Sequence, residues 1–350
     1  MKHRRTQSAC LAGVLLAGVA ALASAQYAKP SDSPVAVVTG VMGYQSTFTP
    51  GVQSVNPEFA PILLVPLGRK LLIESEFEAR LDYSREDAKW GPAVVDYGIE
   101  YLQLDYLAHP NLTVTAGRFL TPFGIYRERL HPIWIRNLAT EPIIFALNES
   151  SSNGAMLRGA ARVSSAMNIT YETYYSAASQ RKLFEAERQA GGRASLVFPD
   201  QRLEVGASFN RNLGNERTNM TGLDLTWIPK SIPLDIRAEG LRNPLHGRGY
   251  WVEVASRLNK LGSGALLRNS QVVARGEQFW VPKAGEDAMA DEGEAGEHEL
   301  PDVNTARLTV GWNFYLYDGF RFTVLYGHNF AEGHRYGIWS VGANYRFAIF

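Results

Sequence analysis

Long stretches of the chain alternate strictly between apolar and polar residues. Between residues 70 and 83, apolar side chains such as Phe77 share one face while charged side chains such as Glu78 share the other. Residues 306–316 and 320–326 follow the same rule. A period of two is typical of β-strands with two different environments. The pattern therefore predicts long strands that are apolar on one side and polar on the other.

The connections between these strands fall into two classes that alternate along the chain. Short turns are predicted at residues 66–68, 109–111, 164–165, 199–200, 229–233, 259–264 and 317–319. Longer connections are predicted at 49–57, 84–93, 121–153, 179–189 and 283–302. A soluble β-sandwich also alternates, but short turns at one end and long loops at the other are typical of outer-membrane barrels.

This rule predicts an all-β fold, a transmembrane antiparallel β-barrel of about 16 strands with one long loop folded inward. An even number of strands lets the sheet close with both termini at the short-turn end. The predicted strands cover residues 35–47, 58–66, 70–83, 94–107, 111–120, 154–163, 167–178, 191–199, 202–212, 217–228, 233–242, 248–258, 266–281, 303–316, 319–331 and 336–350.

The alternation fails at two places. Leu112, Val114 and Ala116 would face lipid, which would also turn Arg118 toward lipid unless the strand bulges at Gly117 or has left the bilayer. An arginine at the midplane costs about 2–4 kcal/mol, so one of these two solutions is required. The parity also slips within residues 102–105, and the sequence gives no reason for this slip.

The first 25 residues have the features of a secretory signal peptide. A basic start is followed by an apolar run and by the small residues Ala23, Ser24 and Ala25. The mature chain, residues 26–350, would then have no cysteine, because Cys10 lies in the leader. It also has no run of the roughly 20 apolar residues that a membrane helix needs, so a spanning structure must be a closed barrel. The expected location is the bacterial outer membrane, after export to the periplasm.

The charge of the mature chain is close to balanced. Without the three basic residues of the leader, 32 lysines and arginines remain against 35 acids, a net charge of −3. This excludes a nucleic-acid partner. Seven of the acids fall within residues 283–299, which we interpret as a solvated outer loop; an alternative role in binding cations is weaker, because the spacing of a calcium loop is absent.

The segment 121–153 differs from every other connection. It contains three prolines, which no central strand tolerates, together with aromatic residues that a solvated linker would not need. It also contains Arg127, Arg129 and Arg136, which outnumber the nearby acid Glu128. We therefore expect an ordered loop that enters the lumen and narrows it.

Seven arginines are the candidate pore-lining and constriction residues. They are Arg127, Arg129, Arg136, Arg158, Arg162, Arg307 and Arg321. If the three loop arginines form a ring of fixed positive charge, the pore would prefer anions mildly. Alternatively, these arginines pair with acids of the wall and pin the loop, and the sequence leaves both interpretations open.

The phrase GRFLTPFGIYRERL, residues 117–130, is similar to the Gly-Arg/Lys-x-x-x-Pro-Phe-Gly element of bacterial porins of the phosphate-selective O and P type. The last strand, ending at Phe350, resembles the carboxy-terminal strand of outer-membrane proteins. The resemblance implies a 16-stranded, trimeric porin with an inward loop. Phosphate-specific members have a lysine cluster in the pore. Of the seven lysines of this mature chain, one precedes the first predicted strand and the other six fall in predicted turns and loops.

The function that we expect is passive diffusion of small hydrophilic solutes or ions, without a cofactor or metal, among outer-membrane lipid and lipopolysaccharide. One alternative is a barrel that serves as a receptor or sleeve for another protein. A weaker alternative is a lipid hydrolase, because residues 151–154 resemble the Ser-Asn-Gly of outer-membrane phospholipases. Those enzymes have a histidine two positions before the serine, where this chain has Glu149 or Ser150, so we expect no enzymatic activity.

Overall fold

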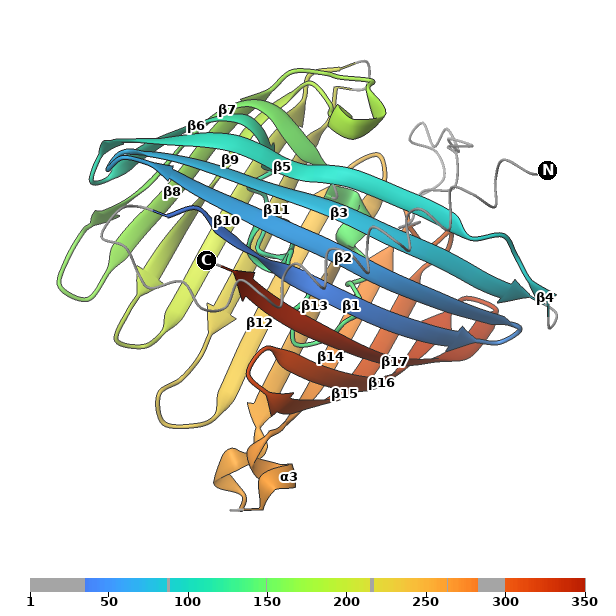
Figure 1. Ribbon diagram of the computed structural model, residues 1–350. Coiled ribbons are helices and arrows are strands. Elements are labelled where there is room, and N and C mark those ends of the chain that lie inside the picture. The colour runs from blue at the N-terminus through green and yellow to red at the C-terminus, as the bar shows by residue number, and fades with distance from the viewer. Residues whose placement is uncertain are drawn as a thin grey trace.

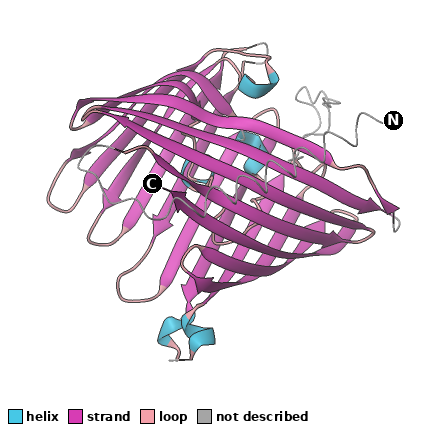
Figure 2. Cartoon of the chain, viewed as in Figure 1, coloured by secondary structure: helices cyan, strands magenta, loops and turns pink. Residues whose placement is uncertain are grey.

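The structure is a computed structural model that describes residues 35–86, 89–148, 150–214, 217–262, 264–282 and 300–349. Most of the described chain is antiparallel sheet (Figure 2). The strands are β1 (Val37–Thr49), β2 (Val52–Leu67), β3 (Leu71–Glu86), β4 (Lys89–Trp90), β5 (Val94–His109), β6 (Leu112–Leu120), β7 (Ser151–Arg162), β8 (Asn168–Ser176), β9 (Gln189–Phe198), β10 (Leu203–Asn212), β11 (Asn219–Trp227), β12 (Leu234–Asn243), β13 (Gly247–Arg257), β14 (Ser270–Trp280), β15 (Thr305–Tyr317), β16 (Phe320–Ala331) and β17 (His334–Ile349).

The sheet closes on itself. Strand β1 pairs with β2 on one side and with β17 on the other, and every other long strand pairs with its two neighbours in sequence. The two-residue strand β4 pairs with the last two residues of β3. The result is a barrel of 16 long strands (Figure 1), so the predicted fold class is confirmed.

The alternation of the sequence becomes the two faces of this barrel. On β13, Tyr250, Val252 and Val254 are 37–45% exposed on the outer face, whereas Trp251 and Glu253 between them are almost completely buried. A lipid-facing apolar band and a polar interior are what a transmembrane barrel requires. Trp251 and Glu253 face the interior of the barrel and are nevertheless buried. Part of the lumen is therefore filled by other residues.

The predicted long connection at 49–57 is wrong. Strands β1 and β2 are joined by the two residues Pro50 and Gly51, and β2 continues through Pro57 and Pro61. Proline has no N–H to donate, which argued against a strand there. The barrel tolerates these prolines because the pairing of β2 with β3 is interrupted around each of them.

Most of the other connections follow the expected plan, with short turns at one end of the barrel and longer connections at the other. Two at the long-loop end are also short, namely residues 244–246 between β12 and β13 and residues 332–333 between β16 and β17. One short-end connection is larger than its neighbours, since it contains η3 (Leu258–Lys260) and α3 (Ala265–Arg268), which project beyond the barrel in Figure 1. Among the described residues, no helix has the length and apolar character needed to cross a membrane. The predicted signal peptide and most of the acidic loop 283–302 lie outside the described residues.

Both breaks in the alternation have a backbone cause. Gly117 adopts a φ of +124°, a conformation that side-chain-bearing residues rarely adopt, and Arg118 beyond it lines a cavity of the lumen. Glu100 is an extra residue in the pairing of β5 with β3, because Glu76 pairs with Tyr101 and the next pair joins Phe77 to Ile99. Such a bulge reverses the faces that follow it, which explains the parity slip at residues 102–105.

Candidate functional site: the lumen and its inward loop

The connection between β6 and β7 lies inside the barrel. It contains α2 (Tyr126–Arg129) and η1 (Phe145–Asn148), and Figure 2 shows cyan helical segments within the barrel. Its apolar side chains form a core with residues of the wall. The buried members of this core are Phe123, Ile125, Tyr126, Leu130, Ile144, Phe145 and Leu147 from the loop and Met220, Leu241, Trp251 and Phe279 from the wall. The aromatic and aliphatic residues that argued for order in the sequence thus seat the loop.

Glycines in the wall make room for the loop. A methyl group built on Gly311 of β15 would lie 2.5 Å from Cδ2 of Leu138, and one on Gly249 of β13 would lie 2.4 Å from Cγ2 of Ile144. Real Cβ atoms essentially never approach another atom so closely. These wall positions therefore act as recesses that receive side chains of the loop.

Polar contacts fix the backbone of the loop to the same part of the wall. The carboxylate of Glu239 on β12 accepts hydrogen bonds from the N–H groups of Ile125 and Tyr126, at 2.8 and 2.9 Å. Arg321 on β16 donates to the carbonyls of Ile133 and Arg136. Buried backbone groups must find partners, and here a carboxyl and a guanidinium group of the wall supply them.

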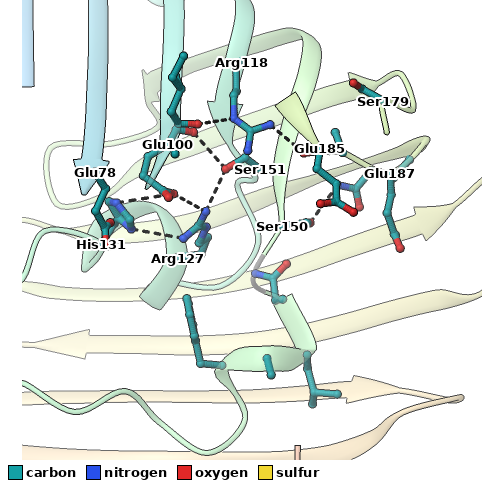
Figure 3. A pocket seen from close by; sticks show the side chains of 18 of the residues that line it. Glu78, Glu100, Arg118, Arg127, His131, Ser150, Ser151, Ser179, Glu185 and Glu187 are labelled. Carbon is teal, nitrogen blue, oxygen red and sulfur yellow. Dashed lines mark hydrogen bonds and ion pairs between the residues drawn. The ribbon is translucent and has the colours of Figure 1, made fainter. Parts of the chain in front are cut away.

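The loop is also tied to the opposite wall (Figure 3). Arg127 donates to the carboxylate of Glu100 at 2.7 Å and to the hydroxyl of Ser151 at 2.9 Å, and its guanidinium lies against the ring of Phe145. Nε2 of His131 lies 3.4 Å from a carboxylate oxygen of Glu76 on β3. Since β3 and β5 supply these acids while β12 and β16 hold the other side, the loop bridges the lumen.

A second group of charges surrounds α2. Arg129 pairs with Glu204 on β10 at 2.6 Å, and Arg158 on β7 lies 4.0 Å from Glu128. Burial, together with the negative charge of the neighbouring Glu172, raises the pKa of Glu128 to about 8. At neutral pH this carboxyl is therefore mostly protonated, which lets two acids share one buried site.

Two cavities, of about 1190 and 1150 Å³, occupy the lumen beside the loop. The residues that line both of them define the place where the cavities meet, which we call the neck. They are Glu58, Arg80, Ile133, Arg136, Glu141 and Ala146. The neck lies between strands β2 and β3 on one side and the loop on the other.

The seven predicted arginines occupy different positions. Arg127, Arg136 and Arg307 line the cavities. Arg129 and Arg158 are held in the cluster around α2, and Arg321 is buried behind the loop. Arg162 lies exposed at the last position of β7, at the short-turn end. It is therefore not a constriction residue, because its strand ends there.

Several residues of the site were missed by the sequence reasoning. Glu58 lies between Pro57 and Pro61 and was predicted only as the first residue of a strand, whereas β2 begins six residues earlier, at Val52. Glu141 lies in the same loop, only five residues after Arg136, which it contacts at 2.7 Å, and it was overlooked. His131 was visible in the loop, but its partner Glu76 could only be found from the fold.

The serines of the hydrolase alternative are engaged elsewhere. The hydroxyl of Ser151 donates to the carbonyl of Glu100 at 3.1 Å and accepts from Arg127, while Ser152 lies 2.9 Å from the hydroxyl of Thr121. A nucleophilic serine needs a base at its proton, and the proton of Ser151 is directed at a carbonyl. Within the described ranges, no group of three histidine, cysteine or acidic residues could hold a metal ion.

No protein-family model and no curated protein matches the chain. Solved structures do match it. The anion-selective porin from Comamonas acidovorans is 10% identical, with a TM-score of 0.56 over 89% of this chain and 99% of that one. OmpT, an outer membrane protein of Vibrio cholerae, is 10% identical, with a TM-score of 0.55 over 91% and 100% of the two chains. Salmonella typhi OmpF is 10% identical, with a TM-score of 0.54 over 89% and 97%.

The chain has the outer-membrane porin fold. At these identities the likeness extends to the fold alone. The sequence resemblance to the phosphate-selective O and P type stays a prediction, because none of these three structures is described as belonging to that type.

Proposed function

We propose that the protein is a passive channel of the bacterial outer membrane for small hydrophilic solutes and ions. The observation that carries this proposal is the pair of cavities that meet at the neck inside a 16-stranded barrel. Barrels of this size are wide enough to keep an aqueous lumen. A loop that bridges the lumen and leaves polar cavities beside it is a suitable size filter.

The mild anion preference expected from the loop arginines stays a prediction. The anion-selective porin from Comamonas acidovorans shares the fold, which is the only support outside the sequence. The charges of the three loop arginines are matched by acids, since Arg127 contacts Glu100, Arg129 contacts Glu204 and Arg136 contacts Glu141. Glu100 and Glu204 belong to the wall, so these two contacts favour the interpretation that Arg127 and Arg129 pin the loop, whereas Glu141 belongs to the loop itself. Assembly as a homotrimer is likewise proposed from the resemblance.

Liposome swelling tests the proposal. Mature protein refolded into liposomes should admit pentoses and hexoses at rates that fall steeply with solute size, because the neck sieves them. Liposomes with heat-unfolded protein serve as the control. If protein that keeps its folded, heat-sensitive mobility on a denaturing gel admits none of these solutes, the channel proposal fails and the receptor or sleeve alternative becomes the better one.

A further inference from the structure

A second connection at the long-loop end of the barrel also borders the lumen. Residues 177–188 join β8 to β9 and contain the short helix η2 (Lys182–Phe184). We call residues 177–188 the second loop. Most of its residues line the larger cavity, so the second loop lies beside the route that solutes would take.

The second loop reaches a part of the wall where one strand has an open edge. Pairing between β5 and β6 begins at Leu102, so residues 94–101 of β5 have β3 on one side and, within the described chain, no strand on the other. An open edge leaves backbone groups without sheet partners. In this part of β5, Asp96 lies 4.0 Å from Nζ of Lys182, and the ring of Tyr97 lies under the same ammonium group. The second loop therefore extends past β6 and β7 to the open edge of β5.

Arg118 of β6 joins the second loop to that edge (Figure 3). Its Nε donates to the carbonyl of Ile99 on β5 at 2.6 Å, and its Nη1 donates to the carbonyl of Glu185 in the second loop at 2.8 Å. Nη1 also donates to Oδ1 of Asn153 on β7 at 3.3 Å, and the amide of Asn153 donates to the carbonyl of Phe184 at 2.6 Å. Two backbone carbonyls of the second loop are thus held by side chains of the wall, one of them by a charged donor, which makes the stronger bond.

The inward position of Arg118 depends on the break in β6 at Gly117. A side chain on Gly117 would collide with the carbonyl oxygen of Leu102, and the φ of +124° is rarely adopted by residues other than glycine. Among the described residues, no carboxylate forms an ion pair with Arg118, in contrast to Arg127 and Arg129 of the inward loop. Arg118 is therefore suited to hold backbone in place rather than to neutralise an acid.

The part of the second loop that Arg118 holds is the tip of a short hairpin. Ser179 and Ala186 exchange two backbone hydrogen bonds, at 2.9 and 3.0 Å, so residues 180–185 form the tip. The base of the hairpin is fixed separately, because the N–H of Leu213 next to β10 donates to the carbonyl of Arg188 at 2.8 Å. Loss of the contacts made by Arg118 would therefore free the tip and leave the base in place.

We propose, on the basis of the channel function above, that the second loop is a constriction element of the larger cavity and that Arg118 is the residue that positions it. The tip, residues 180–185, then sets the largest hydrophilic solute that enters this cavity. A hydrogen bond from a charged donor is strong enough that its loss would shift the tip from the held toward the released position by roughly 10- to 100-fold.

Liposome swelling with solutes of increasing size tests this proposal. Arg118→Met keeps an unbranched side chain but removes its donors, so it should raise the rate for a disaccharide, relative to the rate for a pentose, severalfold. Arg118→Lys keeps one charged donor group and should give a ratio between those of Arg118→Met and the wild type. Arg162→Met is the matched control, because it removes an exposed arginine at the opposite, short-turn end of the barrel and should keep the wild-type ratio.

Shortening the tip separates a positioning role of Arg118 from a general effect on the barrel. Because Ser179 and Ala186 exchange both backbone hydrogen bonds, the dipeptide Asn-Gly can replace residues 180–185 as a two-residue hairpin turn. This shortened variant should admit the disaccharide at least as fast as Arg118→Met does. Adding Arg118→Met to the shortened variant should change the ratio no further, because the segment that Arg118 holds is already absent.

Two results would overturn the proposal. One is a disaccharide-to-pentose ratio that stays at the wild-type value in the shortened variant, which gives this measurement even if Arg118→Met fails to fold. The other is an effect of Arg118→Met that is equally large with and without the tip, because Arg118 would then act elsewhere in the lumen. Folded wild-type protein that admits no pentose would instead refute the channel function, on which this proposal rests.

Discussion

Gly311→Ala should loosen the inward loop without changing the outer surface of the barrel. The added methyl group would lie 2.5 Å from Cδ2 of Leu138, whereas its other neighbours, in Leu325 and Val324, lie at 3.6 and 3.7 Å. Leu138 must therefore move by about 1 Å to reach ordinary van der Waals contact, and it is 1% exposed in a packed cluster. Overpacking of this kind costs about 1–3 kcal/mol.

A free-energy cost of that size would shift the equilibrium from the loop packed against the wall toward the displaced loop by roughly 5- to 150-fold. We expect a noisier open-channel current and a lower temperature of conversion from the folded to the unfolded band on a denaturing gel. Gly276→Ala is the matched control, because a methyl group there meets no atom within 4 Å. It should behave like the wild type in both assays.

The double variant Gly311→Ala with Leu138→Ala tests whether the added methyl group collides with Leu138. Leu138→Ala alone removes buried atoms and should destabilise the loop. It also removes the atom with which the new methyl group collides, so the double variant should be less destabilised than the two single effects added together. If Gly311→Ala matches Gly276→Ala, or if the two effects simply add, the loop is not seated in this recess.

Three further outcomes follow from the structure. Val310→Arg, on the lipid face, should lower folding yield far more than Asn212→Arg in the larger cavity, because an arginine at the midplane costs about 2–4 kcal/mol; equal yields in urea-dilution refolding would contradict the faces described here. The folded protein holds a proton on Glu128 up to a pH of about 8, whereas the unfolded chain releases it near 4.5, so stability should fall as the pH rises between these values. The variant Glu128→Gln should flatten that profile in gel-shift melts, and an unchanged profile would argue against the shared site. Refolded protein should not hydrolyse phospholipid in mixed micelles, and hydrolysis that Ser151→Ala abolishes would revive the enzyme alternative.

The barrel could be predicted from the sequence because the patterns that define it lie within single strands and single connections. Alternation along residues such as 306–316 sets the faces, and the contrast between turns and long connections sets the number of strands and their direction. The errors arose where a local rule had an exception. The first part of β2, up to Pro57, was predicted as a loop, and the bulge at Glu100 reversed a face without any signal in composition.

The site was less predictable, because it is formed by contacts between residues that are far apart in the sequence. The loop arginines were identified, but the partners that neutralise them lie up to 75 positions away, as Arg129 and Glu204 illustrate. The parity rule predicted which strand residues face inward, yet it could not indicate which of them the loop covers. Thus Arg321 is buried behind the loop, whereas Arg307 lines a cavity.

The central claim is that the barrel is an open channel, and single-channel recording tests it most directly. Mature protein, refolded and purified in its heat-sensitive form, should insert into a planar lipid bilayer and produce discrete current steps of uniform size in KCl. The steps should be absent with heat-unfolded protein. Insertion of folded protein, verified by its protection from protease in the same lipid, without any steps would contradict the account and would indicate that the loop closes the barrel.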